Sequence, residues 1–170
     1  MKQPLRAVVV GTGSYVPEKV ITNDDLSRLV DTSDEWIRTR TGIRERRVLA
    51  EEQATSDMCE EAARQALADA RLRPEDVDLI IVATVTPDML FPSTACLVQE
   101  KLGLRAPAMD LHAACASFVY ALVTGTQFIA TGCSRLVLVI GADCNSRVLK
   151  PSDKKTYPLF GDGAGAVLLA

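Results

Sequence analysis

The sequence lacks the residue patterns that most often mark metal, disulfide or nucleic-acid sites. It contains one histidine and five cysteines in 170 residues, and no two cysteines are spaced as C-x-x-C. Structural zinc sites and disulfide frameworks use paired ligands, so neither is predicted. The net charge of −3 and the isoelectric point near 5.2 argue against binding to nucleic acid or to an anionic membrane. We expect a cytoplasmic protein with reduced cysteines.

Charge is absent from one long stretch, because no Asp, Glu, Lys or Arg lies between Asp110 and Arg135. A surface helix carries a polar outer face, so this segment predicts a helix buried in the core. The stretch is long enough to span a membrane as a helix, but residues such as Thr124 and Gln127 make it too polar for a membrane helix. No secretory signal is expected either.

Cys115 stands in this uncharged stretch among small residues, where the pattern predicts a helix that begins near Cys115 and stops at Gly132. The backbone N–H groups and the dipole at a helix start favour a thiolate over a thiol. The sequence therefore predicts Cys115 as a nucleophile. The alternative is a small buried hydrophobic residue, which is how we interpret the other four cysteines.

Strands and helices alternate along the chain. Two short helices are predicted to start near Asn23 and Ser33, and three longer helices are predicted to cover residues 56–70, 92–102 and 115–132. The predicted strands cover residues 5–10, 77–85, 106–109, 136–140 and the segment that ends at 169. The apolar runs 77–85 and 136–140 are typical of strands buried on both faces of a parallel sheet. We expect an α/β fold with helices on both faces.

Two glycine-rich runs resemble phosphate-binding loops without meeting their requirements. Gly11 and Gly13 follow the first predicted strand, where we expect a turn, but the third glycine of a dinucleotide-binding motif is missing. The run 161–165 has no following Lys-Ser or Lys-Thr pair. We interpret this second run as structural backbone geometry.

Five motifs in order carry a resemblance to a known family. They are GTGSYVPE near the start, VDTSDEWIRTRTGIRERR at 30–47, FPSTACLVQ at 91–99, AACASF at 113–118 and LFGDGAGAVLL at 159–169. Together they resemble the N-terminal half of a β-ketoacyl-acyl carrier protein synthase III, in the thiolase superfamily. The resemblance implies a thiolase-like fold in which residues 1–170 form one βα half of a five-layer αβαβα sandwich. The C-terminal half is then absent from this chain.

The resemblance implies an acyltransferase of fatty acid initiation. Cys115 would accept an acyl group, commonly acetyl, from acyl-coenzyme A, and its backbone N–H would contribute to an oxyanion hole. Condensation with malonyl-acyl carrier protein would follow, using a histidine and an asparagine of the missing half. The resemblance also implies a homodimer, acyl-coenzyme A and acyl carrier protein as partners, and no separate cofactor.

The resemblance also assigns substrate-binding residues. Trp36 would stack on the adenine of coenzyme A, with Thr32 and Arg40 beside it, and Lys154 replaces the family's second stacking arginine. A hydrophobic anchor with a solvated basic face is the alternative for Trp36. Phe91 would reach into the partner's acyl pocket or pack in the core, and Phe160 would border the pocket.

Three residues depart from the family pattern: His112, Ser117, where glycine is usual, and Lys154. The only histidine lies three residues before Cys115, but a residue at that spacing on a strand-to-helix turn need not face the sulfur. These departures leave open a polyketide-priming relative with a different starter acyl group. The missing half leaves open a non-catalytic half that acts as a scaffold.

Overall fold

The computed structural model describes residues 6–170, which divide into two compact units. The larger unit contains the described residues up to Tyr15, Thr55–Asp143 and Ala164–Ala170. The smaller unit contains Val16–Ala54 and Cys144–Gly163. Each unit is built from segments far apart in the sequence, and each has its own sheet.

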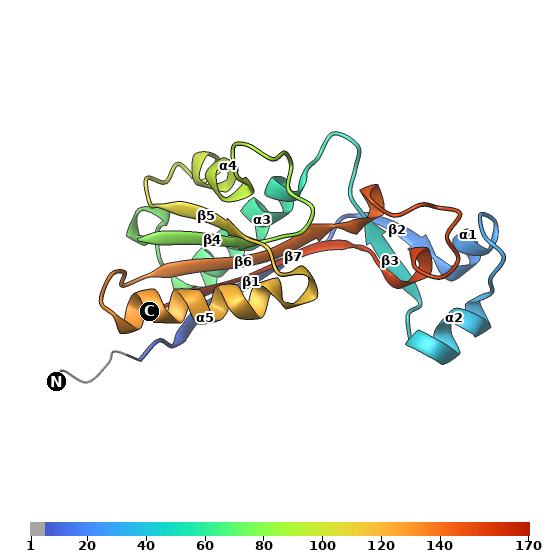
Figure 1. Cartoon of the computed structure of the whole chain (residues 1–170), viewed down its shortest axis with the longest axis horizontal. Helices are drawn as coiled ribbons and strands as arrows, with labels where there is room; N and C mark the ends of the chain where they lie inside the picture. Colours follow the sequence, from blue (N-terminus) through green and yellow to red (C-terminus); the bar gives the residue numbers. More distant parts are fainter. Residues whose placement is uncertain (1–5) are drawn as a thin grey trace. The chain divides into compact units, whose positions relative to one another are not determined.

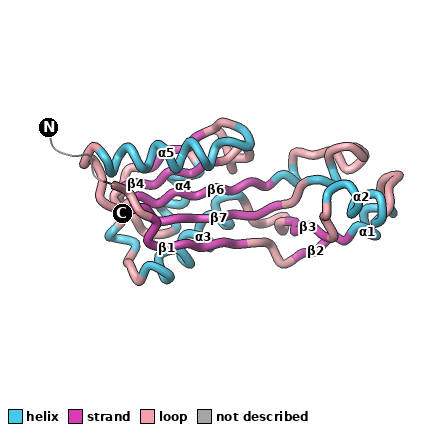
Figure 2. Tube along the Cα trace, turned by 90° about the horizontal axis from the view of Figure 1, so that it is seen from below, coloured by secondary structure: helices cyan, strands magenta, loops and turns pink. Residues whose placement is uncertain are grey.

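Within the described residues, the larger unit is built on a five-stranded sheet with the order β1-β7-β6-β4-β5 (Figure 1). Figure 2 shows β4, β6, β7 and β1 side by side. The strands are β1 (Val9–Tyr15), β4 (Leu79–Ala83), β5 (Ala108–Leu111), β6 (Val137–Cys144) and β7 (Asp162–Leu169). Strand β4 pairs in parallel with both β5 and β6, whereas β1 pairs antiparallel with β7. The α/β prediction is confirmed, but the sheet is mixed and not wholly parallel.

Helices cover both faces of this sheet (Figure 1). Helices α3 (Thr55–Ala70) and α4 (Thr94–Lys101) pack on one face, and α5 (Ser117–Ala130) packs on the other. Successive strand side chains point to opposite faces, so Ile80 and Val82 contact the α3 and α4 side while Ile81 contacts the α5 side. All of β4 is buried, as its continuous apolar run predicts.

The two glycines near the start do not form the expected turn. The predicted strand began at Leu5, which lies outside the described residues, and β1 continues through Gly11 and Gly13 to Tyr15. A Cβ on Gly13 would lie 2.1 Å from the Ala62 carbonyl oxygen of α3, and one on Gly11 would lie 2.5 Å from the Ala66 oxygen. The glycines therefore allow strand and helix backbones to approach closely.

In the smaller unit, β2 (Lys19–Thr22) pairs antiparallel with β3 (Glu45–Val48), next to α1 (Asn23–Ser27) and α2 (Asp34–Thr41). The cap of α1 is Thr22 and not Asn23. The Thr22 hydroxyl accepts a hydrogen bond from the Asp25 amide at 3.1 Å, and the Asp25 carboxylate accepts one from the Thr22 amide at 3.0 Å. Asn23 is instead the first residue of the helix, and it is buried inside the unit.

Arg46 stands in an arginine-rich stretch of the sequence but is buried in the smaller unit. Only 8% of Arg46 is exposed. Its guanidinium donates hydrogen bonds to the Ile21 carbonyl, to Asn23 Oδ1 at 2.9 Å and to the Pro158 carbonyl at 3.0 Å. Burial lowers the pKa of the Arg46 guanidinium. This arginine holds the smaller unit together.

The run 161–165 contains a buried carboxylate with a structural role. Asp162 accepts hydrogen bonds from the Leu49 amide at 2.8 Å and from both the amide and the hydroxyl of Ser146. The aspartate of the GDGAGA motif thus ties two separate chain segments to the start of β7. This arrangement fits the structural interpretation of the motif.

Candidate active site

Cys115 lies in a short 3-10 turn, Ala114–Ala116, between β5 and α5. Regular α-helix begins at Ser117, two residues later than the sequence predicted, and ends at Ala130 before Gly132. The Cys115 side chain is exposed. The sulfur is therefore presented at the entrance to the helix and not buried in its first turn.

The turn around Cys115 has an unusual backbone. Ala114 has a φ of 49°, in the left-handed region. That region costs a non-glycine residue roughly 1–2 kcal/mol. The Ser117 hydroxyl accepts a hydrogen bond from the Ala113 amide at 2.7 Å and donates one to the Ala114 carbonyl at 2.7 Å. Contacts from the first residue of α5 thus hold the strained alanine in place.

The backbone hydrogen bonds of this turn use the amides of Ala116 and Ser117. They do not use the amide of Cys115. An amide beside an attacking sulfur is the kind of donor that an oxyanion hole requires. The turn combines an exposed thiol with a backbone donor on the same residue.

The other cysteines differ from Cys115 in environment. Burial raises the pKa of the Cys59 thiol well above its usual value, and the carboxylates of Asp88, Asp110 and Asp143 raise it further. Burial also raises the pKa of Cys144, with a smaller contribution from Asp162.

Cys96 is half-buried, and its sulfur accepts a hydrogen bond from the Ser93 hydroxyl at 3.2 Å. Cys133 is exposed, so the prediction of four buried cysteines is wrong for this residue.

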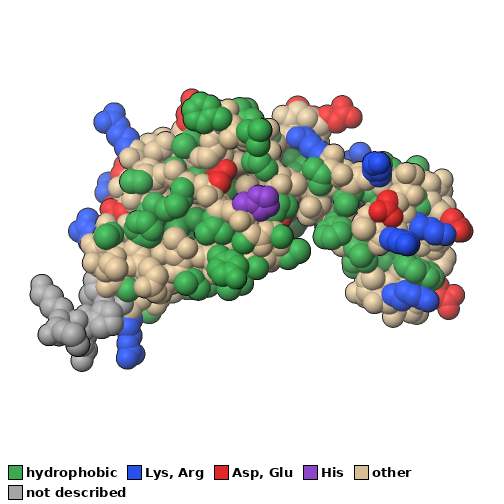
Figure 3. All heavy atoms as spheres, viewed as in Figure 1, with side chains coloured by type: hydrophobic (Ala, Val, Ile, Leu, Met, Phe, Trp, Pro, Cys, Tyr) green, Lys and Arg blue, Asp and Glu red, His purple; other side chains and the backbone are tan. Residues whose placement is uncertain are grey.

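Helix α5 is buried on one face only. Ala121 and Ile129 pack against the sheet, but Val119 and Tyr120 on the outer face are 60% and 57% exposed. Hydrophobic side chains gather over this part of the larger unit (Figure 3). The prediction of a wholly buried helix is therefore wrong for this chain. No helix within residues 6–170 has the length and apolar character needed to cross a membrane.

Two other residues singled out in the sequence lie in the larger unit. His112 is exposed, and no hydrogen bond joins it to Cys115 within the described chain. Phe91 is 89% exposed in the loop before α4, which excludes the core-packing alternative within this chain. Neither residue contributes to the turn around Cys115.

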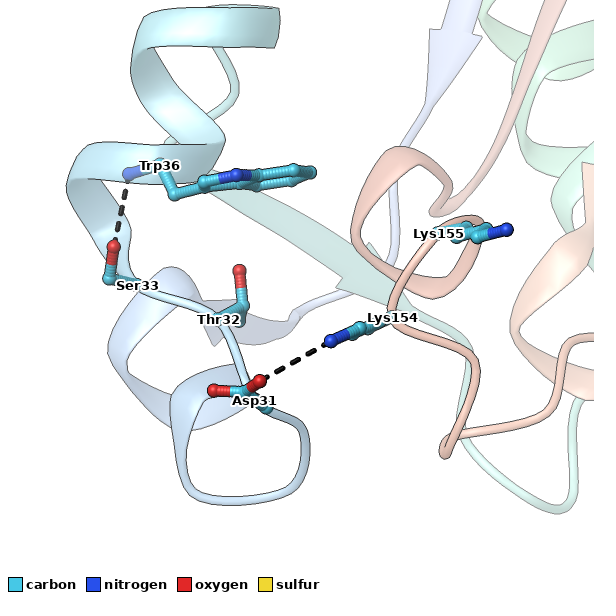
Figure 4. A pocket seen from close by; sticks show the side chains of 6 residues that line it. All are labelled: Asp31, Thr32, Ser33, Trp36, Lys154 and Lys155. Carbon is cyan, nitrogen blue, oxygen red and sulfur yellow. Dashed lines mark hydrogen bonds and ion pairs between the residues drawn. The ribbon is translucent and has the colours of Figure 1, made fainter.

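The smaller unit contains an open cleft of about 530 Å³ (Figure 4). Its lining residues are Asp31, Thr32, Ser33, Trp36, Lys154 and Lys155. Three of them, Thr32, Trp36 and Lys154, were predicted from the resemblance. No pattern in the sequence pointed to Asp31, Ser33 or Lys155 as cleft residues, apart from their position next to these three.

Trp36 is placed by the first turn of α2. The Ser33 hydroxyl caps that helix by accepting a hydrogen bond from the Trp36 amide at 3.1 Å. Arg40, one turn further along, has its guanidinium carbon 4.6 Å from the centre of the Trp36 ring. This cation–π contact holds the arginine beside the ring of Trp36, a residue that is 42% exposed.

The remaining polar groups of the cleft differ in how they are satisfied. The Thr32 hydroxyl is buried and has no hydrogen-bond partner among the described residues. Lys154 Nζ lies 3.3 Å from a carboxylate oxygen of Asp31, whereas the Lys155 side chain turns away from the indole (Figure 4). The cleft thus offers an aromatic face, a hydroxyl and an ammonium group. Phe160 lies elsewhere in the smaller unit, beside Leu26 and Tyr157.

Asp153 shapes the loop that carries both lysines. Its carboxylate accepts hydrogen bonds from the Thr156 hydroxyl at 2.7 Å and from the Lys155 amide at 2.9 Å. The Thr156 bond, and then the Lys155 bond, lower the pKa of Asp153 below its usual value of 3.8. Because the folded-state pKa is the lower one, these bonds contribute stability above that value and lose it as the pH falls further.

We therefore expect Asp153→Ala to loosen this loop at neutral pH but not in acid. Hydrogen exchange at the Lys155 amide should be faster in the variant than in the wild type at pH 7. The difference should disappear only as the pH falls through the lowered pKa of Asp153, where the wild-type carboxyl becomes protonated. Equal exchange at pH 7 would contradict a structural role for Asp153.

Comparison with known proteins shows which proteins this chain is similar to. The family model described as 3-oxoacyl-[acyl-carrier-protein (ACP)] synthase III matches residues 109–170. A β-ketoacyl-[acyl-carrier-protein] synthase III from Xylella fastidiosa is 57% identical over 170 residues, which are 99% of this chain and 52% of the relative. The chain thus spans about half the length of such relatives.

Solved structures agree with the sequence matches. A 3-oxoacyl-[acyl-carrier-protein] synthase III from Aquifex aeolicus has a TM-score of 0.94 at 52% identity, over 96% of this chain and 53% of that one. The priming β-ketosynthase of the R1128 polyketide pathway has a TM-score of 0.95 at 34% identity, over 100% of this chain and 51% of that one.

Proposed function

We propose that this chain, which belongs to the β-ketoacyl-[acyl-carrier-protein] synthase III family and shares its thiolase-like fold, is the acyl-accepting half of a condensing enzyme. The observation that carries this proposal is the turn at residues 114–116. It presents an exposed thiol and a backbone donor on one residue, at the start of a helix. Cys115 is the acyl acceptor.

The acyl transfer uses groups that this turn provides. The Cys115 thiol loses its proton, and the thiolate attacks the carbonyl carbon of an acyl-coenzyme A thioester. Negative charge develops on the carbonyl oxygen, where the Cys115 amide can donate a hydrogen bond. A new carbon–sulfur bond forms and the one to coenzyme A breaks. Coenzyme A leaves as a thiolate and takes up a proton, so the reaction is balanced.

The cleft of the smaller unit is proposed to bind the nucleotide part of acyl-coenzyme A. The exposed face of Trp36 suits stacking on adenine. The Thr32 hydroxyl can satisfy its hydrogen bond with a polar group of the ligand. Arg40 and Lys154 bring positive charge to a phosphorylated ligand. Coenzyme A derivatives are substrates in this scheme.

The complete protein is proposed to carry out a second step. The acyl group on Cys115 would condense with malonyl-acyl carrier protein, with loss of carbon dioxide, to give a β-ketoacyl product. The histidine and asparagine for this step, and most of the surface for the carrier protein, would come from the remaining half. A homodimer in which Phe91 and Phe160 border acyl pockets belongs to the same proposal.

A direct experiment tests the first step. The complete protein is incubated with acetyl-coenzyme A, digested, and its cysteine peptides are compared by mass spectrometry. We expect an acetyl adduct on the Cys115 peptide and none on the Cys133 peptide, since both cysteines are exposed but only Cys115 lies in the turn. The absence of an adduct at saturating donor concentrations would leave the non-catalytic scaffold as the better function.

Replacing Trp36 by alanine tests the nucleotide site. Base stacking on an aromatic side chain contributes about 1–3 kcal/mol, so KM for acetyl-coenzyme A should rise by about 10- to 100-fold. The turnover number should change much less, since Trp36 is not in the turn that carries the thiol. Initial rates over a range of donor concentrations measure both constants.

Leu29→Ala provides a matched control for this measurement. Leu29 is also an exposed apolar residue of the smaller unit, at 62% exposed, but it does not line the cleft. Its removal should leave KM within about twofold of the wild type, as for most surface changes away from a site. A similar KM for all three proteins would argue against adenine stacking on Trp36.

A polyketide-priming role is the second candidate function. It is favoured by the likeness to the R1128 priming ketosynthase, which at 34% identity superposes as well as the synthases III. The two functions differ in the starter acyl group. Competition between acetyl-coenzyme A and longer or branched acyl donors for Cys115 separates them, because the preferred donor identifies the role.

A further inference from the structure

The hydroxyl of Ser117 contacts the turn of Cys115 from inside the molecule. Ser117 is 4% exposed, and it begins α5. The neighbouring residues 113, 114 and 116 are alanines, which have no polar side chain. Among the described residues, Ser117 supplies the side-chain hydrogen bonds to this backbone, one accepted from the Ala113 amide and one donated to the Ala114 carbonyl.

The Ala114 carbonyl accepts two hydrogen bonds from the same residue. One comes from the Ser117 hydroxyl at 2.7 Å, and the other comes from the Ser117 backbone amide. Two donors on one carbonyl fix its direction more tightly than the backbone bond alone. This constraint acts on a residue whose backbone conformation, with φ at 49°, is otherwise unfavourable for alanine.

The direction of this carbonyl determines the direction of the Cys115 amide. The Ala114 C=O and the Cys115 N–H belong to the same peptide group, which is planar, and in a trans peptide they point in opposite directions. Holding the carbonyl toward Ser117 therefore holds the N–H of Cys115 on the opposite side. The hydroxyl bonds to the Ala113 amide and the Ala114 carbonyl and not to the sulfur, so its influence on Cys115 passes through the peptide plane.

We infer that Ser117 is a positioning residue that orients the Cys115 amide as an oxyanion donor for acyl transfer. The inference rests on the proposed function of Cys115. Loss of an oxyanion donor costs about 100- to 1,000-fold in rate, and a donor that is misdirected but still present costs less. Ser117→Ala should therefore lower the acylation rate of Cys115 by about tenfold.

The experiment compares two reactions of the same thiol in the complete protein. Transfer from acetyl-coenzyme A develops charge on a carbonyl oxygen, whereas alkylation by iodoacetamide displaces iodide at a saturated carbon and needs no oxyanion donor. In Ser117→Ala, we expect acylation to fall about tenfold. Alkylation should stay within about twofold, since a turn that keeps its thiol exposed keeps that reaction.

The control variants separate positioning from folding. Ser117→Thr keeps the hydroxyl and should retain most of the acylation rate. Thr126→Val removes a hydroxyl from the same helix, one that donates to the Leu122 carbonyl at 2.9 Å, and should affect neither reaction. If Ser117→Ala does not fold, Ser117→Gly provides a second hydroxyl-free variant.

Three results would overturn the inference. They are an unchanged acylation rate without the hydroxyl, an equal fall in acylation and alkylation, and an equal effect of Thr126→Val. If the wild type itself is not acylated, the proposed function fails and the positioning role fails with it. If the wild type is acylated and Ser117→Ala matches it, only the positioning role fails.

Discussion

Replacing Cys115 by serine is expected to abolish the acetyl adduct formed with acetyl-coenzyme A. A serine hydroxyl is a weak nucleophile unless an adjacent base activates it, and His112 makes no hydrogen bond to residue 115 in the described chain. Loss of the nucleophile should therefore lower the acylation rate on the order of 1,000-fold or more, as it does for other covalent catalysts. Intact-protein mass spectrometry after timed incubation measures the loss.

Cys133→Ser is the matched control for this experiment. Cys133 is exposed and lies just beyond the opposite end of the same helix, so its replacement removes an accessible thiol without changing the turn of Cys115. This variant should form the adduct at the wild-type rate. If Cys115→Ser still gains one acetyl group while Cys133→Ser gains none, the acyl acceptor has been assigned to the wrong cysteine.

The sequence predicted the parts of the fold that local patterns determine. The apolar run 77–85 became β4, which is buried throughout, and the spacing of alanines in 56–70 became the buried face of α3. The helix start at Ser33 was also recognisable, because a hydroxyl next to a helix start has a local function. These features depend on few neighbours in sequence.

Features that depend on distant segments could not be predicted in the same way. Nothing in the local sequence marks Arg46 as buried, yet its hydrogen-bond partners include the Pro158 carbonyl, 112 residues away. The uncharged stretch predicted a buried helix, but the outer face of α5, which carries Val119 and Tyr120, is exposed in this chain. Burial depends on what packs against a segment, and local composition does not reveal that.

The candidate site shows the same division. Cys115 could be chosen from the sequence because a thiol at a helix start suggests chemistry, whereas Trp36 was assigned through the family resemblance. The left-handed conformation of Ala114 had no signal, since glycine is the residue that normally marks it. Ser117 was noticed only as a departure from glycine, and its two hydrogen bonds became visible only with the turn.

Gly13→Ala should destabilise the larger unit severely, because the added methyl group has no space. Its Cβ would lie 2.1 Å from the Ala62 carbonyl oxygen and 2.5 Å from the Ala66 amide nitrogen, both backbone atoms of α3. A flexible side chain could move aside, but here either β1 or the helix must shift. Overpacking of side chains in a core costs typically 1–3 kcal/mol, so a clash with backbone should cost at least about 3 kcal/mol.

Gly165→Ala is the control for this prediction. It tests whether the loss of stability in Gly13→Ala arises from the close approach of β1 to α3, and not simply from replacing a glycine in a strand. Gly165 lies in β7, paired with Ser14 of β1, and a Cβ at that position meets no heavy atom within 4 Å. Its free energy of unfolding should stay within about 1 kcal/mol of the wild type, since alanine fits an open strand position. Chemical denaturation of the three proteins gives the comparison. A Gly13→Ala variant as stable as the wild type would mean that β1 and α3 lie further apart than the glycine contacts indicate. A large difference between the two variants attributes the loss of stability to the close approach at Gly13.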